Sequence, residues 1–209
     1  MRIFKSSLMN TKENRSARIE EITRRLTSCF SVSETDGEAK MGDIIYEMLA
    51  ENPYFQAHPE NLRRLPIAGD PWGRISVLAL MRGEKRPSSK TVVTIGHFDT
   101  VGISDYGALA PYANQPDLLR EKLRALELPE NVRADLESGD YLFGRGAFDM
   151  KSGDAVLIEL LEELAGQVSE LEGNILFGTV CDEECNSRGM LRFVPELERL
   201  QREEGLDFL

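Results

Sequence analysis

Three short apolar segments of this chain each lead directly into a loop that carries an acidic residue or a histidine. These segments are TVVTI at 91–95, YLF at 141–143 and GNILFGTVC at 173–181. Helix-type stretches alternate with them, which is typical of a three-layer α/β sandwich with helices on both sides of a mixed, mainly parallel sheet. In such folds ligand sites collect beyond the carboxyl ends of the strands. The pattern therefore predicts the fold and a site where the three loops meet.

Hydrophobic periodicity and turn signals place the remaining elements. Helices are expected over 11–27, 38–51 and 153–165, around 118–126 and from 189 to 205, with further strands over 62–67 and 74–81. Ser152 is expected to cap the helix over 153–165, because serine side chains accept hydrogen bonds from N-terminal amides. The final GLDFL resembles the start of another strand, so we expect the sequence to cover part of a larger protein.

Charge and cysteine content limit the function classes. The net charge of −11 over 209 residues argues against a nucleic-acid partner or an anionic membrane surface, both of which require basic patches. A cationic or neutral substrate and bound metal cations are compatible with this charge. Three cysteines form no even disulfide framework, and no apolar run approaches the ~20 residues of a membrane span, so we expect a cytoplasmic protein.

His97 and Asp99 directly follow the apolar run 91–95. Residues two apart in extended backbone point to the same side, so Asp99 is positioned to accept one ring N–H of His97. The other ring nitrogen would then be free to bind a metal ion. The alternative is a histidine that is simply satisfied by a neighbouring loop aspartate, and a lone H-x-D pattern favours this reading.

Asp149 lies in the glycine-rich segment GRGAFDMKSGD. A phosphate-binding P-loop would need glycine directly before Lys151 and Ser152, but Met150 stands there, which excludes that motif. Two interpretations remain for Asp149. It caps the following helix, or it is a carboxylate whose two oxygens bridge two cations.

The segment CDEEC at 181–185 also has competing interpretations. A thiolate zinc site is disfavoured, because the spacing of Cys181 and Cys185 is poor, no second cysteine pair exists and Cys181 belongs to the apolar strand. An acidic turn that is merely solvated is the common alternative. In the functional interpretation one glutamate holds a metal ion while its neighbour takes a proton from metal-bound water.

Taken together, the motifs GHFDTV, GRGAFDMKSG and DEECNSRGM resemble those of the zinc-dependent exopeptidase and amidohydrolase family of carboxypeptidase G, aminoacylase and succinyl-diaminopimelate desuccinylase. Their order and strand context agree with that family, and LTSCFSVSETDGEA resembles its first helix and loop. The stretch from GHFDTVG to DYGALAP is most similar to the arginine-utilisation branch. The resemblance implies a hydrolase that cleaves amide bonds in peptides or N-acyl amino acids with a water activated by two zinc ions, for which cobalt and manganese are alternatives.

The resemblance also implies roles for individual residues. His97 would bind one metal ion, Asp149 would bridge both, and Glu184 would bind the second. Asp99 and Glu183 are the predicted catalytic residues, Asp99 by orienting His97 and Glu183 as the general base. A cis peptide bond between Asp149 and residue 150 is a further implication.

The chain departs from the family pattern at two metal ligands and at the lid. The family has a further carboxylate on the next strand and a histidine far toward the C-terminus. Asp207 lies too early on that strand, and His58 lies in a polar loop before the core. We therefore expect residues 1–209 to be the N-terminal portion of a catalytic domain, without the lid through which such proteins dimerise. The alternative is a catalytically incompetent fragment or remnant with at most a binding or scaffolding role.

Overall fold

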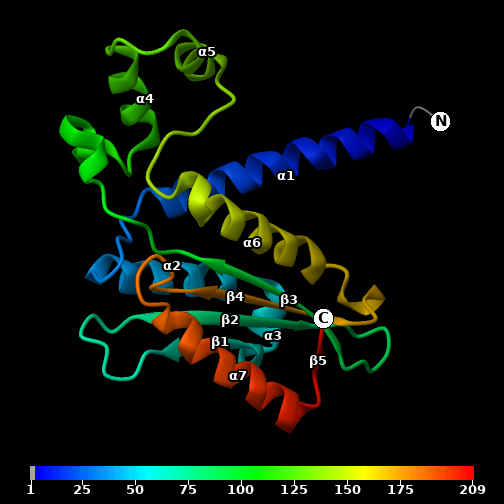
Figure 1. Ribbon diagram of the computed structural model, residues 1–209. Coiled ribbons are helices and arrows are strands. Elements are labelled where there is room, and N and C mark those ends of the chain that lie inside the picture. The colour runs from blue at the N-terminus through cyan, green and yellow to red at the C-terminus, as the bar shows by residue number, and fades with distance from the viewer. Residues whose placement is uncertain (1–2) are drawn as a thin grey trace.

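Helices cover both faces of a five-stranded sheet in the computed structural model, which describes residues 3–209 and the side chains of residues 14–209 (Figure 1). The strands are β1 Leu62–Pro66, β2 Ile75–Arg82, β3 Lys90–His97, β4 Asn174–Val180 and β5 Asp207–Phe208. Their order across the sheet is β1-β2-β4-β3-β5. The β1–β2 and β2–β4 pairs are antiparallel, whereas β4–β3 and β3–β5 are parallel. The predicted α/β sandwich with a mixed sheet is confirmed, but the sheet is not mainly parallel, since two of its four strand pairs are antiparallel.

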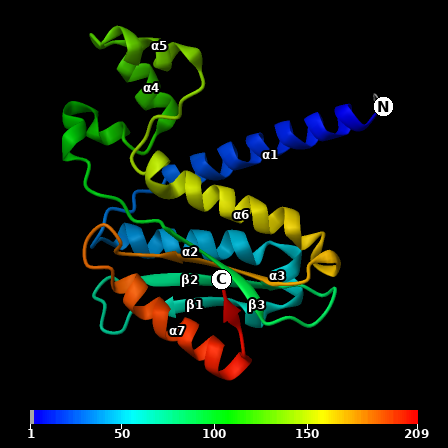
Figure 2. The same ribbon diagram turned by 45° about the vertical axis from the view of Figure 1, so that its right-hand side comes forward.

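The α-helices of residues 3–209 differ in how they lie against the sheet. They are α1 Ile3–Thr27, α2 Asp36–Ala50, α3 Pro53–Ala57, α4 Pro116–Arg124, α5 Glu130–Ser138, α6 Ser152–Ala165 and α7 Arg188–Glu204. Both views show α1 lying along α6, while α4 and α5 project away from the sheet (Figures 1 and 2). In the part of the chain that is described, no helix combines the length and apolar character needed to cross a bilayer.

Each face of the sheet has its own hydrophobic core. The larger core joins α1, α2, α3 and α6 to one face through buried side chains that include Leu26, Ile45, Phe55, Ile158, Val77 and Phe177. The smaller core joins α7 to the opposite face through Phe193, Leu200, Leu78, Leu80 and Leu176. Strand β2 lies inside both cores, which explains why ISVLALM has no polar residue after Ser76.

Most expected elements are present, and three local predictions are wrong. Residues 141–143 form no strand; they line a cavity beside α1 and α4 instead, because an extended apolar segment can pack against helices as well as enter a sheet. Ser152 does not cap α6, since the chain already turns helically at Lys151, and the Ser152 hydroxyl donates to the Phe148 carbonyl at 3.3 Å.

The third wrong prediction concerns the burial of 91–95. A short apolar strand such as TVVTI is of the type that is buried in a parallel or mixed sheet, but Val92 is 47% exposed and Ile95 is 37% exposed. The reason is position in the sheet. The register of β5 with β3 covers only Lys90 and Thr91, so the outer edge of β3 toward His97 faces no strand within residues 3–209.

The packing of α7 gives a test of the smaller core. The fully buried Phe193 ring occupies the space above Gly178, where an added Cβ would lie 2.2 Å from the ring. We expect Phe193→Ala to lower the free energy of unfolding by about 3–5 kcal/mol, measured by urea denaturation, because it leaves a cavity. Leu191→Ala on the same helix is the control, since Leu191 is 72% exposed and its loss should change stability by less than ~0.5 kcal/mol. Equal effects of both substitutions would contradict this description of the core.

Candidate metal centre

The three loops that carry the predicted metal ligands meet at one end of the sheet. His97 ends β3, Asp149 lies in the turn Ala147–Lys151 before α6, and Glu184 lies in the loop after β4. Each offers one potential ligand atom, and these three atoms lie within 4.8 Å of one another. Because β3 and β4 are parallel and His97 pairs with Val180, both strands deliver their loops to the same end of the sheet. Imidazole and carboxylate groups at this spacing are a donor set suited to zinc and similar divalent ions.

The His97 ring lies between two carboxyl-bearing residues. Its Nε2 is 3.1 Å from Asp149 Oδ1, and its Nδ1 is 3.2 Å from the main-chain oxygen of Asp99. The Asp99 carboxylate is farther from Nδ1, at 3.7 Å. The side-chain contact expected from the H-x-D spacing is therefore replaced by a closer main-chain contact, because the Asp99 carboxylate is directed toward other partners.

Those partners belong to the loop after β4. The buried Asp99 Oδ1 accepts a hydrogen bond from the Glu183 amide, and Oδ2 accepts one from the Glu184 amide, both at 3.0 Å. The Ser33 hydroxyl also donates to Oδ2 at 2.8 Å. Burial acts to raise the pKa of Asp99, but these hydrogen bonds and the nearby His97 ring outweigh it and lower the pKa. Asp99 thus fixes the main chain that carries Glu183 and Glu184, a role that the sequence did not predict.

Two buried ionisable residues near Asp149 were also missed by sequence reasoning. Asp154 of α6 is fully buried and accepts a hydrogen bond from the Thr179 hydroxyl at 2.8 Å, and burial raises its pKa to about 8. A Cβ at Gly96 would lie 1.9 Å from the Asp154 carboxyl, so only glycine permits α6 to approach β3 here. Lys151 is buried and donates to the Cys29 carbonyl at 2.9 Å, which joins the end of α1 to the Asp149 turn.

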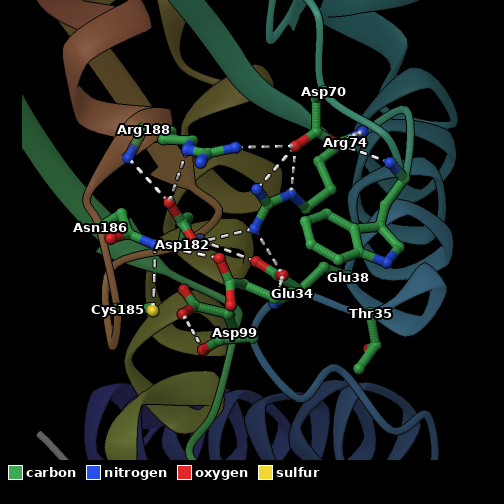
Figure 3. A network of polar contacts seen from close by, with 12 residues as sticks. Glu34, Thr35, Glu38, Asp70, Arg74, Asp99, Asp182, Cys185, Asn186 and Arg188 are labelled. Atoms are coloured by element: carbon green, nitrogen blue, oxygen red, sulfur yellow. Dashed lines mark hydrogen bonds and ion pairs between the residues drawn. The ribbon is translucent and has the colours of Figure 1, made fainter.

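A buried arginine lies behind the loop after β4. Arg74 contacts carboxylates of Glu38, Asp70 and Asp182, and all four side chains are fully buried (Figure 3). The only sequence signal for it is an arginine placed directly between the turn GDPWG and a fully apolar strand.

The electrostatics of the site favour a cation. Burial and the neighbouring carboxylates of Asp149 and Glu183 raise the pKa of Glu184. Burial acts to lower the pKa of His97, but the surrounding carboxylates of Asp99, Asp149 and Glu183 outweigh it and raise the pKa from 6.5 to about 9. Without a metal ion, the histidine is therefore protonated at neutral pH and is itself the cation of the cluster.

Other candidate groups lie outside this cluster. Asp207 pairs with Lys90 at the amino end of β3, about 23 Å along the strand from His97. His58 lines a separate cavity with Tyr54 and Glu84, in agreement with its expected surface position.

The cysteines and the backbone at Asp149 also match the sequence interpretation. Burial raises the pKa of the Cys181 thiol to about 12, which opposes its use as a thiolate ligand. The peptide bond between Asp149 and Met150 is cis, as the family resemblance implies.

The pKa of His97 leads to a pH prediction. Because the folded-state pKa exceeds 6.5, protonated His97 stabilises the metal-free chain below about pH 6.5, and this contribution is lost as the pH rises through about 9. In ¹H NMR of the metal-free chain, with His58→Gln used to assign the second histidine, the His97 ring should titrate near pH 9. Asp149→Asn should lower this midpoint by removing the partner at 3.1 Å. A midpoint at or below 6.5 with Asp149 intact would contradict the geometry.

Comparison with known proteins gives the family of the chain and agrees with this fold. Residues 93–209 match the profile of peptidase family M20/M25/M40. Protein RocB of Bacillus subtilis is 37% identical over the whole chain, which covers 36% of RocB. The uncharacterized protein YqjN of the same organism is 40% identical over 90% of the chain and 34% of its own length. The dipeptidase Dug1p of Saccharomyces cerevisiae superposes over 97% of this chain and 39% of its own, with a TM-score of 0.62 and 17% identity. The chain thus spans about a third of the length of the curated relatives it matches.

Proposed function

Because the chain belongs to peptidase family M20/M25/M40, we propose that it forms part of a metal-dependent hydrolase that cleaves amide bonds in peptides or N-acyl amino acids. The observation that carries the proposal is the convergence of potential ligand atoms from His97, Asp149 and Glu184 within 4.8 Å. The similarity to RocB supports the arginine-utilisation branch predicted from the motifs.

Each side chain has a distinct part in the proposed reaction. His97 and Asp149 would hold one divalent ion, and Asp149 and Glu184 would hold a second, with zinc as the expected metal. When bound, the two ions would polarise the amide carbonyl and acidify the attacking water. Glu183, which is 52% exposed and 3.9 Å from His97 Nε2, would serve as the general base that accepts a proton from the attacking water and passes it to the leaving amine. Asp99 keeps Glu183 and Glu184 in place through their main-chain amides.

The ligand set within this chain gives each ion two protein contacts, whereas catalytic zinc sites usually have three. We therefore propose that residues 1–209 are the N-terminal portion of the catalytic domain. The remaining ligands, the lid and a dimer interface formed through the lid would then lie in other parts of the intact protein. A cytoplasmic location is part of the same proposal, and the three free cysteines Cys29, Cys181 and Cys185 support a reducing compartment.

The incomplete ligand set yields the first of two predictions from the proposed function. The 209-residue chain alone should be poor in metal and essentially inactive, because each ion lacks a ligand and the acidic cluster repels itself without cations. The intact protein should bind two divalent ions and hydrolyse dipeptides or N-acyl amino acids. Elemental analysis and hydrolysis assays on both proteins test this. Two tightly bound zinc ions and full turnover in the short chain would show that its ligand set is complete.

The same comparison tests the alternative function. An intact protein that neither binds metal nor hydrolyses an amide would favour a binding or scaffolding role over catalysis.

A second prediction separates the two adjacent glutamates. In the intact protein, Glu183→Gln should reduce kcat by about 10²–10⁴-fold while both metal ions are retained, because only proton transfer is lost. Glu184→Gln should instead reduce metal content. Glu198→Gln is the matched control, since Glu198 is exposed on α7, and it should change neither quantity. Loss of metal in Glu183→Gln with full retention in Glu184→Gln would reverse the assignment.

A further inference from the structure

We propose that the buried ion cluster of Glu38, Asp70, Arg74 and Asp182 positions the segment Asp182–Glu184 for its role in the metal centre. Arg74 and Glu38 are then positioning residues, although neither is part of the ligand set. The link to catalysis rests on the proposed function, whereas the positioning of the segment can be measured without it.

The cluster is organised around one guanidinium group. Arg74 Nη1 donates to Glu38 Oε2 and to Asp182 Oδ1, each at 2.8 Å. Its Nε and Nη2 both donate to Asp70 Oδ1, at 3.0 and 2.7 Å. The partners come from α2, from the turn before β2 and from the loop after β4, so a single side chain connects three separate segments (Figure 3). The planar fork of arginine allows these contacts simultaneously, which the ammonium of lysine does less well.

The cluster reaches the main chain of the glutamate segment directly. Glu38 Oε1 accepts the amide hydrogen of Asp182 at 2.8 Å, and Asp182 Oδ2 accepts that of Arg188 at 3.1 Å. Asp182 has a φ of +64°, in the left-handed region that non-glycine residues seldom adopt. The contacts of Glu38 and Arg74 hold this unusual conformation, and it determines the direction in which the chain enters Glu183.

Three successive amides are consequently bound by carboxylates. Glu38 holds the amide of Asp182, and Asp99 holds those of Glu183 and Glu184. Because Asp99 lies two residues after His97, the glutamate segment is fixed relative to the histidine on one side and relative to α2 on the other. This double attachment fixes the main chain of the segment, while the Glu183 and Glu184 side chains lie near His97.

The composition of the cluster argues against a purely stabilising role. It contains three carboxylates and one arginine, and the next cation, Arg188, is 43% exposed and lies 3.8 Å from Asp70. Buried ion pairs are often neutral or unfavourable for stability relative to well-packed apolar groups. The specific result of this cluster is the backbone geometry of residues 182–184.

Arg74→Lys tests the proposal, because it keeps the charge and removes the fork. Amide hydrogen exchange in the 209-residue chain, followed by NMR, should show at least tenfold faster exchange at Asp182, Glu183 and Glu184. Amides in the centres of β2 and β4 should be unaffected. In the intact, metal-loaded protein kcat should fall about 10–100-fold with KM little changed, as is typical when a group that orients a metal site is altered. Arg63→Lys is the matched control, since Arg63 also pairs with two glutamates but lies on β1, and it should affect neither readout.

Glu38→Gln provides a second variant in case Arg74→Lys does not fold. It retains an acceptor for the Asp182 amide but loses the charged contact with Arg74, so a smaller change in the same direction is expected. Unchanged exchange at 182–184 in the variants, or equal acceleration throughout β2 and β4, would overturn the proposal. If the intact protein proves inactive and metal-free, the proposed function fails, while the exchange data still decide whether the cluster positions the segment.

Discussion

The carboxylate of Asp99 is the contact on which the geometry of the site depends. It is buried at the end of β3 and accepts hydrogen bonds from the Glu183 and Glu184 amides after β4 and from the Ser33 hydroxyl after α1. Parallel pairing of β3 and β4 brings these segments to the same end of the sheet, but pairing alone does not fix a loop. One ionised side chain, strengthened by low local polarity, joins the histidine loop to the glutamate loop.

The site and the cluster behind it share one electrostatic problem, which is an excess of buried or crowded negative charge. On the inner side Arg74 compensates Glu38, Asp70 and Asp182. At the metal centre, His97 is the one cation among the described side chains that compensates Asp149 and its neighbours, and it does so by binding a proton. A divalent ion would replace that proton, so the same histidine can neutralise the cluster or bind a metal ion, but not both.

The sequence was informative where a local pattern carries the signal. The positions of His97 and Glu184 directly after strands predicted that their loops meet at one end of the sheet. Asp149 joins them, although the segment 141–143 before it forms no strand. The Arg74 contacts could not be predicted, since Glu38 and Asp182 are 36 and 108 residues away and their pairing depends on how α2 packs on β2. Residues 141–143 show the converse limit, because apolar character fixed neither their burial nor their packing partner: Tyr141 is 53% exposed, and the segment lies beside α1 and α4. The exposure of 91–95 likewise depends on sheet position, which no local pattern encodes.

The outer edge of β3 has a consequence for how this chain behaves in concentrated solution. Beyond Val93, whose amide donates to the Leu209 carbonyl, the backbone groups of this edge face no strand within residues 3–209. The adjoining Ile95 side chain is 37% exposed, so the edge is apolar as well as unpaired. Unprotected edges of this type are templates for intermolecular strand addition. Self-association of the 209-residue chain is therefore expected to begin by β-pairing at this edge, next to the residues that form the candidate metal centre.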